Sequence, residues 1–189
     1  MLYGCDISHH NSTILTNYNK YDFYIMKATE GKTYVDPRWR SHLAHVLKAN
    51  KLYGFYHYAR PENNSSLEEA KHFVNQVGKY AGNAIFALDW EQTALKYDIT
   101  WALNWLNSVY DMTGVRPVIY IQASECKRLK PILDNNYGLW VAQWNSAITK
   151  PNTGVYPYYA LWQYTNSPID LDIFNGNAKQ WKAYCKVNK

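Results

Sequence analysis

Two carboxylates at the end of one apolar segment are the residues in this sequence that are best placed to do chemistry. Residues 84–91 are typical of a strand, and the alternation of side chains puts Asp89 and Glu91 on the same face. Two carboxyl groups this close in a partly dry site cannot both ionise freely, so one pKa rises and that group can donate a proton at neutral pH. A solvated Asp-x-Glu strand is the competing interpretation, but the apolar run before the pair favours a buried site with acid catalysis.

Charged residues also lie near the ends of two other predicted strands. Asp6 is near the end of the first strand, and the second strand runs into Lys27 and Glu30. In a parallel barrel, chemistry takes place at the C-terminal ends of the strands. Asp6 alone could also begin a turn or cap a helix.

The elements that must position these residues are short strands alternating with helices over the first two thirds of the chain. Strands are expected at residues 2–8, 23–29, 52–58, 84–91 and 118–122, then at 139–143, 160–165 and 169–174. Ser66 and Glu69 predict a capping box that begins one helix, and Gly114 suits the C-terminal end of another. A last helix is expected over residues 178–185.

This order of elements predicts an α/β fold, a TIM-like barrel of five βα units followed by three β strands. An open doubly wound sheet is the competing architecture, but its GxGxxG fingerprint is absent. No linker or internal repeat interrupts the sequence. We therefore expect residues 1–189 to form a single catalytic domain.

Aromatic side chains are abundant, with 18 Tyr, 8 Trp and 5 Phe, and many lie near the predicted strand ends. These are Tyr53, Tyr56, Tyr58, Tyr120, Trp140, Trp144, Trp162 and Tyr164. Each one alone is more typical of a core residue than of a ligand contact. Beside carboxylates at the same rim, however, they offer flat apolar faces for sugar rings and polar edges for hydroxyl groups. The combination predicts glycoside hydrolysis.

Other chemistries have no motif in the sequence. The histidines at positions 9, 10, 42, 45 and 72 are expected at the surface or in packed positions, while the role of His57 stays open. No HExxH, GxSxG or GxxxxGK motif is present. Cys5, Cys126 and Cys185 are too few for a disulfide framework, although one disulfide stays an open alternative. We expect no cofactor and no metal.

Charge and hydropathy limit the partners. The formal net charge is +5 and the basic residues are scattered, which favours mild attraction to a polyanionic surface and argues against a nucleic-acid tail. No apolar run approaches the roughly 18 to 20 residues that membrane insertion requires. The first residues read directly as a strand, without a signal-peptide pattern, and no obligate protein partner is evident.

Seven short motifs occur in order along nearly the whole chain. They are GCDIS at 4–8, KATEG at 27–31, GFYHYAR at 54–60, ALDWE at 87–91, LWVA at 139–142, WQYT at 162–165 and IDLD at 169–172. Together they resemble glycoside hydrolase family 25, the Chalaropsis-type lysozymes or N-acetylmuramidases, which include many bacteriophage endolysins. Any one motif is weak evidence, but seven in this order are highly specific.

The resemblance implies the barrel described above and hydrolysis of the β-1,4 bond between N-acetylmuramic acid and N-acetylglucosamine in peptidoglycan, with net retention. It implies that Glu91 is the general acid and Asp89 its partner, with Asp6 and Asp170 as further rim acids. The implied substrate contacts are Lys27, Glu30, Tyr56, Tyr58, Tyr120, Trp140, Gln163 and Asp172. Asp172 stands at a position that is often Asn in the family pattern, and Gln143-Trp144 stands where the family more usually has a Tyr.

The resemblance also suggests a phage or prophage endolysin, made in the host cytoplasm and acting on the cell wall after holin-type release or secretion. Three questions stay open at this point. Asp89 could attack the anomeric carbon, or it could orient the 2-acetamido group of the substrate to do so. The chain could instead be a non-catalytic glycan-binding barrel, although the acid pair argues against this. A chitinase-like activity ranks last, because no DxxDxDxE run is present.

Overall fold

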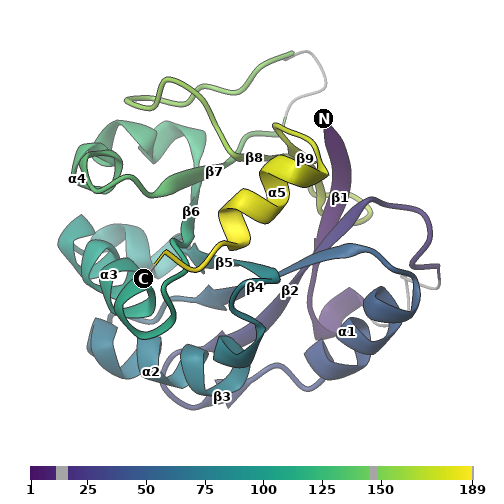
Figure 1. Cartoon of the computed structure of the whole chain (residues 1–189). Helices are drawn as coiled ribbons and strands as arrows, with labels where there is room; N and C mark the ends of the chain where they lie inside the picture. Colours follow the sequence, from purple (N-terminus) through teal and green to yellow (C-terminus); the bar gives the residue numbers. More distant parts are fainter. Residues whose placement is uncertain (12–16, 145–148, 189) are drawn as a thin grey trace.

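A closed β-sheet forms the centre of the molecule (Figure 1). The computed structural model describes residues 1–11, 17–144 and 149–188. The strands are β1 (Leu2–Ile7), β2 (Phe23–Glu30), β3 (Tyr34–Val35), β4 (Leu52–Tyr58), β5 (Ala84–Asp89), β6 (Val118–Gln122), β7 (Gly138–Ala142), β8 (Leu161–Thr165) and β9 (Leu171–Phe174). Their order is β1-β9-β8-β7-β6-β5-β4-β2-β3, and an additional pairing of β1 with β2 closes the barrel.

The pairing directions agree with the predicted architecture. Neighbouring strands from β1 through β2 and β4 to β8 run parallel, whereas β9 is antiparallel to both β8 and β1. The short strand β3, which was not predicted, pairs antiparallel with the end of β2. The TIM-like barrel expected from the sequence is therefore confirmed, with one small strand added at its edge.

Helices cover the outside of the barrel and cross one end of it. The α-helices are α1 (Trp39–Lys48), α2 (Ser66–Val77), α3 (Ile99–Thr113), α4 (Lys130–Asp134) and α5 (Ala178–Cys185). The 3-10 helices are η1 (His9–Asn11), η2 (Gly78–Tyr80), η3 (Gln92–Lys96) and η4 (Ala123–Arg128). In the described part of the chain, α-helices follow β2, β4, β5 and β6, whereas only η1 follows β1. None of the described helices is long and apolar enough to cross a membrane.

The start of α2 differs from the prediction by one residue. Ser65, not Ser66, is the N-cap, and Glu68, not Glu69, completes the capping box. The predicted box was wrong because Glu69 is buried and accepts a hydrogen bond from Nε2 of His57 at 2.7 Å. At the end of α3, Gly114 has a φ of 74°, which confirms its predicted role as the residue that caps the C-terminal end of this helix.

The barrel interior is apolar at one end and acidic at the other. Phe23 and Phe174 point inward near the floor, and Trp181 of α5 packs against both, with ring centroids 4.7 and 5.1 Å away. Gly4 leaves room for this packing, because a Cβ there would come within 2.4 Å of the Phe23 ring. Helix α5, drawn in yellow across the barrel in Figure 1, thus supplies the floor of the interior.

The alternation predicted for the fourth expected strand, β5, is confirmed. Phe86, Leu88 and Trp90 are fully buried in the layer between sheet and helices, while Ile85 and Ala87 belong to the interior cluster. The strand ends at Asp89, two residues earlier than expected. All three cysteines are buried and free, so the disulfide left open by the sequence is not formed.

Candidate active site

A cavity of about 300 Å³ opens at the C-terminal ends of the parallel strands. It is lined by Asp6, Tyr56, Asp89, Glu91, Gln92, Tyr120, Trp140, Trp144, Gln163, Asn166 and Asp170. Eight of the twelve predicted site residues are in this set, including all four proposed acids. The predicted contacts Lys27, Glu30, Tyr58 and Asp172 do not line it.

Asp89 and Glu91 lie on the wall formed by β5 and the residues directly after it. Asp89 is 8% exposed, and its Oδ1 is buried without a hydrogen-bond partner among the described residues. Burial, and then the charge of Glu91, raise the pKa of Asp89 well above its usual range. Burial, followed by the charge of Asp170, also raises the pKa of Glu91. The pair therefore holds a proton at a pH where isolated carboxyl groups would both be ionised.

Asp6 is tied to the opposite wall through an amide. Nε2 of Gln163 donates to Oδ2 of Asp6 at 2.6 Å, and the hydroxyl of Tyr120 donates to Oε1 of Gln163 at 3.0 Å. The indole of Trp144 donates to the same Oε1 at 2.9 Å. Burial, followed by the charges of Asp172 and Asp170, raises the pKa of Asp6 well above its usual value. Gln163 thus fixes three groups of the cavity at once.

Asp172 lies deeper in the barrel interior than Asp170, because Asp172 is within β9 and Asp170 precedes that strand. Asp172 lies within β9, is fully buried, and accepts a hydrogen bond from the indole of Trp140 at 2.8 Å. Burial raises its pKa to about 8. Asp170 precedes β9 and lines the cavity. Only Asp170 of these two is therefore placed to meet a ligand in the cavity.

Aromatic rings form the remaining walls. Trp140 packs edge-on against Tyr120 and Tyr56, with centroids 5.0 and 6.4 Å away. All three rings are more than half buried, so their orientations are fixed by the core. The aromatic wall expected from the strand ends is therefore present beside the acids.

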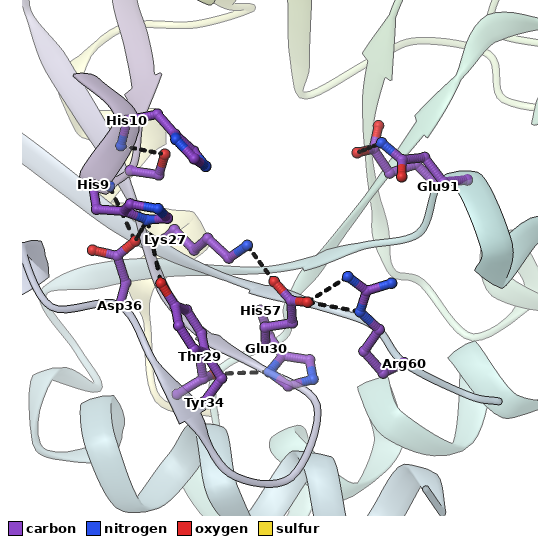
Figure 2. A network of polar contacts seen from close by, with 12 residues as sticks. His9, His10, Lys27, Thr29, Glu30, Tyr34, Asp36, His57, Arg60 and Glu91 are labelled. Carbon is purple, nitrogen blue, oxygen red and sulfur yellow. Dashed lines mark hydrogen bonds and ion pairs between the residues drawn. The ribbon is translucent and has the colours of Figure 1, made fainter. Parts of the chain in front are cut away.

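Lys27, Glu30 and Arg60 form a chain of ion pairs beside the cavity, and none of the three residues lines it (Figure 2). Nζ of Lys27 lies 2.6 Å from Glu30, and Nε of Arg60 donates to Glu30 at 2.7 Å. Although burial opposes it, the bonds from both cations lower the pKa of Glu30. The ring of Tyr58 lies between the two cations, 4.7 Å from Lys27 Nζ and 4.8 Å from the Arg60 guanidinium.

The histidines lie outside the cavity. His57, whose role was open, is fully buried on the outer side of β4, where it bonds Thr29 at 2.8 Å as well as Glu69. Burial lowers its pKa, so the ring is neutral and packs as a structural group. In the residues that the structure describes, no group of three or more His, Cys, Asp or Glu side chains is arranged to hold a metal ion.

Three lining residues were not predicted as site residues. The sequence indicated Trp144 as one of the aromatic residues near the strand ends, and its spacing of two from Ala142 and four from Trp140 agrees with the alternation of β7, but it was not predicted as a substrate contact. Gln92 begins η3 and Asn166 directly follows β8, and Gln92 has a φ of 50°, which no simple sequence pattern signals.

Comparisons with known proteins identify the family of this chain. The sequence profile described as Glycosyl hydrolases family 25 matches residues 5–173. The chain belongs to this family. As a family 25 member it is a glycoside hydrolase, and Asp6, Asp89, Glu91 and Asp170 all lie in the matched segment.

Individual relatives cover most of this family 25 chain. Lysozyme M1 of Streptomyces globisporus is 29% identical over 202 residues, covering 93% of this chain and 68% of that protein. An N,O-diacetylmuramidase of a Chalaropsis species is 28% identical and covers 75% of each chain. The solved structure of a family 25 lysozyme from Aspergillus fumigatus superposes with a TM-score of 0.84 at 26% identity, over 98% of this chain and 99% of that one.

Proposed function

We propose that this chain is a lysozyme, an N-acetylmuramidase that hydrolyses the β-1,4 bond between N-acetylmuramic acid and N-acetylglucosamine in peptidoglycan. The observation that carries the proposal is the carboxyl pair Asp89 and Glu91, which shares a cavity with the buried rings of Tyr120 and Trp140 and the partly buried ring of Tyr56. The names of the relatives, a lysozyme and a diacetylmuramidase, support the same substrate.

Protonated Glu91 donates its proton to the glycosidic oxygen as the bond from that oxygen to the anomeric carbon breaks. A water molecule then adds its hydroxide to the anomeric carbon and returns a proton to Glu91. Asp89 supports the positive charge at the sugar, and its unpartnered Oδ1 is suited to accept the N–H of a 2-acetamido group. In this proposal, substrate binding makes Asp89 the anion and leaves the proton of the pair on Glu91.

The finer expectations are also proposals. Net retention requires that Asp89, or the acetamido oxygen that it orients, bonds to the anomeric carbon as the leaving sugar departs. Water then breaks that bond in the second step. NMR of the anomer that first appears in hydrolysate would test this, and initial formation of the α-anomer would contradict it. A bacteriolytic role as an endolysin is a further proposal, and the charge of +5 supports approach to an acidic cell wall.

The central test is clearing of purified bacterial cell walls, with mass spectrometry of the fragments released. We expect Glu91→Gln to lower the rate at neutral pH by roughly 10² to 10⁴-fold, because it keeps the shape of the acid but has no proton to donate. Gln180→Ala, a change in α5 far from the cavity, serves as the control. Clearing by Glu91→Gln at the rate of the unchanged protein would exclude Glu91 as the acid.

A further inference from the structure

Glu69 of α2 is fully buried and does not line the cavity that holds the acids. Its carboxyl group receives hydrogen bonds from three donors. Oε2 accepts from Nε2 of His57 at 2.7 Å, and Oε1 accepts from Nδ2 of Asn64 at 2.7 Å. The backbone N–H of Arg60 lies 3.2 Å from Oε1 and 3.1 Å from Oε2. Because a buried carboxyl group is costly unless donors surround it, these bonds fix the segments that supply the donors.

The bonds of Glu69 reach both partners of one ion pair beside the cavity. His57 bonds the hydroxyl of Thr29 at 2.8 Å, and Thr29 precedes Glu30 in β2. On the other side, Arg60 gives its backbone N–H to Glu69 and its side-chain Nε to Glu30, the latter at 2.7 Å. Glu69 therefore anchors the backbone at both ends of the pair formed by Glu30 and Arg60.

The loop that carries Arg60 is also joined to the end of β5. The N–H of Ala59 donates to the backbone oxygen of Asp89 at 3.1 Å. Nδ2 of Asn64 donates to the backbone oxygen of Arg60 at 3.1 Å as well as to Glu69. The place of Arg60 relative to Asp89 is thus set by the contacts that Glu69 and β5 make with this loop.

Arg60 compensates the negative charge of Glu30 close to the acid pair. Burial dominates the pKa of Asp89, and Lys27 and Glu30 act on it in opposite senses, the cation lowering it and the carboxylate raising it. Glu30 lies between Lys27 and Arg60, so two cations and one carboxylate leave one positive charge in excess (Figure 2). If Arg60 leaves Glu30, this excess is lost and the pKa values of the acid pair rise.

The other titratable groups that face the acid pair are carboxyl groups and phenols. They are Asp6 of β1, Tyr56 and Tyr58 of β4, Tyr120 of β6 and Asp170 before β9. Burial raises the pKa of all three phenols, which are therefore neutral. No Lys or Arg is in the described lining of the cavity, so positive charge acts on the pair from beside it. Arg60 is itself faced by Glu30, by Glu62 at 3.5 Å and by the ring of Tyr58.

We propose that Glu69 is a positioning residue for the acid pair, which acts through the backbone of Arg60 and so keeps the guanidinium on Glu30. This inference rests on the proposed function, because it gives a residue outside the cavity a part in the hydrolysis. A purely structural Glu69 would stabilise the loop without any effect on the protonation of Asp89 and Glu91.

The test follows the protonation of the acid pair with and without substrate. NMR of the carboxyl carbons gives the pKa values of Asp89 and Glu91 in the free protein, and kcat/KM for wall hydrolysis gives the pH profile. In Glu69→Ala and in Arg60→Met, we expect both to move upward by about 0.3 pH unit, because positive charge near the pair is lost. Arg40→Met, which removes an exposed arginine of α1, is the control and should leave both in place.

Two further variants separate positioning from a loss of folding. Glu69→Gln keeps an oxygen for the N–H of Arg60. Its amide can donate to the other tautomer of His57, which then donates to the hydroxyl of Thr29. We therefore expect Glu69→Gln to keep most of the original pH profile. Asn64→Ala removes one bond to the same loop and should give a smaller upward shift, which carries the test if Glu69→Ala does not fold.

Combined variants show whether the effect passes through Arg60. In the Arg60→Met protein, adding Glu69→Ala or Asn64→Ala should shift the pKa values no further. Additive shifts, or pKa values that neither Glu69→Ala nor Asn64→Ala moves, would overturn the inference. Absence of wall cleavage by the unchanged protein would instead contradict the proposed function, and the carboxyl titrations would still decide whether Glu69 acts on the acid pair.

Discussion

Lys27 places a positive charge beside the two carboxyl groups without entering their cavity. Its field lowers the pKa of Asp89 and of Glu91, against the larger effect of burial. The bond to Glu30, itself held by Arg60, fixes where that charge stands (Figure 2). A substrate contact, as expected from the family resemblance, stays a prediction for Lys27, but the geometry favours an electrostatic role.

Replacing Lys27 by Met should shift the whole pH profile of wall hydrolysis upward. Without the cation, both Asp89 and Glu91 hold their protons to higher pH, so the acidic and the alkaline limbs move in the same direction. The profile of kcat/KM against pH measures this. Lys32→Met is the control, since Lys32 lies in an exposed pair with Glu68. Unmoved limbs in Lys27→Met would contradict the electrostatic role.

Asp170→Asn should move the pH profile in the opposite direction to Lys27→Met, because the charge of Asp170 raises the pKa of both Asp89 and Glu91. The charge of Asp170 raises the pKa of Glu91, after burial, so its removal lets Glu91 lose its proton at lower pH. We expect the alkaline limb to move to lower pH with a partial loss of rate at neutral pH. Asp134→Asn, in an exposed pair with Lys130, removes a carboxylate elsewhere as the control. An alkaline limb that stays in place would remove Asp170 from the tuning of the acid.

Among the elements, the sequence predicted the strands and the faces of their side chains better than it predicted where helix α2 begins. The inward and outward faces of β5 followed from alternation alone, which is why Asp89 and Glu91 could be found. The capping box was misplaced because Ser65 with Glu68 and Ser66 with Glu69 both match the same pattern. Only the tertiary contact between Glu69 and His57 decides between them.

Two adjacent serines offer a direct measurement of that choice. Ser65→Ala removes the side chain that accepts from the backbone N–H of Glu68, and it should lower the free energy of unfolding by about 1 kcal/mol. Ser66→Ala lies inside the helix and should change it by less than about 0.5 kcal/mol. Urea unfolding of both variants compares them. A larger loss for Ser66→Ala would restore the capping box that the sequence predicted.

Depth along the barrel is the other property that sequence alone did not predict. Asp170 and Asp172 have the same spacing as the residues of any strand face, yet one lines the cavity and the other is sealed beneath Trp140. Likewise Lys27 points along the rim to Glu30 instead of into the cavity. Such differences depend on which neighbouring side chains fill the interior, and a single sequence does not encode that locally.

For the whole molecule, the buried acids tie stability to pH. Asp172 binds its proton up to a pH of about 8 in the folded state. In the unfolded chain it loses that proton near pH 3.9. Between these values the folded state holds more protons, so the free energy of unfolding falls as pH rises. Asp6 and Asp89, whose pKa values are also raised, contribute in the same direction.

Asp172→Asn should remove part of this dependence. The amide oxygen can still accept from the indole of Trp140, but the side chain no longer has to ionise in the core. We expect the variant to equal the unchanged protein near pH 4 and to exceed its free energy of unfolding by about 1 to 3 kcal/mol at pH 8. Urea unfolding at the two pH values tests this. A difference that is the same at both would show that Asp172 does not titrate in this range.

The closure of the barrel also has a consequence for the cell that makes the protein. Leu2 pairs with Phe174 and Cys5 with Leu171, so the sheet can close only after both β1 and β9 have been synthesised. Asp6 meets Gln163 only at that stage, and the floor needs Trp181 as well. A nascent chain still on the ribosome therefore lacks an assembled carboxyl cluster. Synthesis that stops before β9 and α5 leaves a polypeptide without this cluster, which delays hydrolytic activity until residues 171–185 have been made.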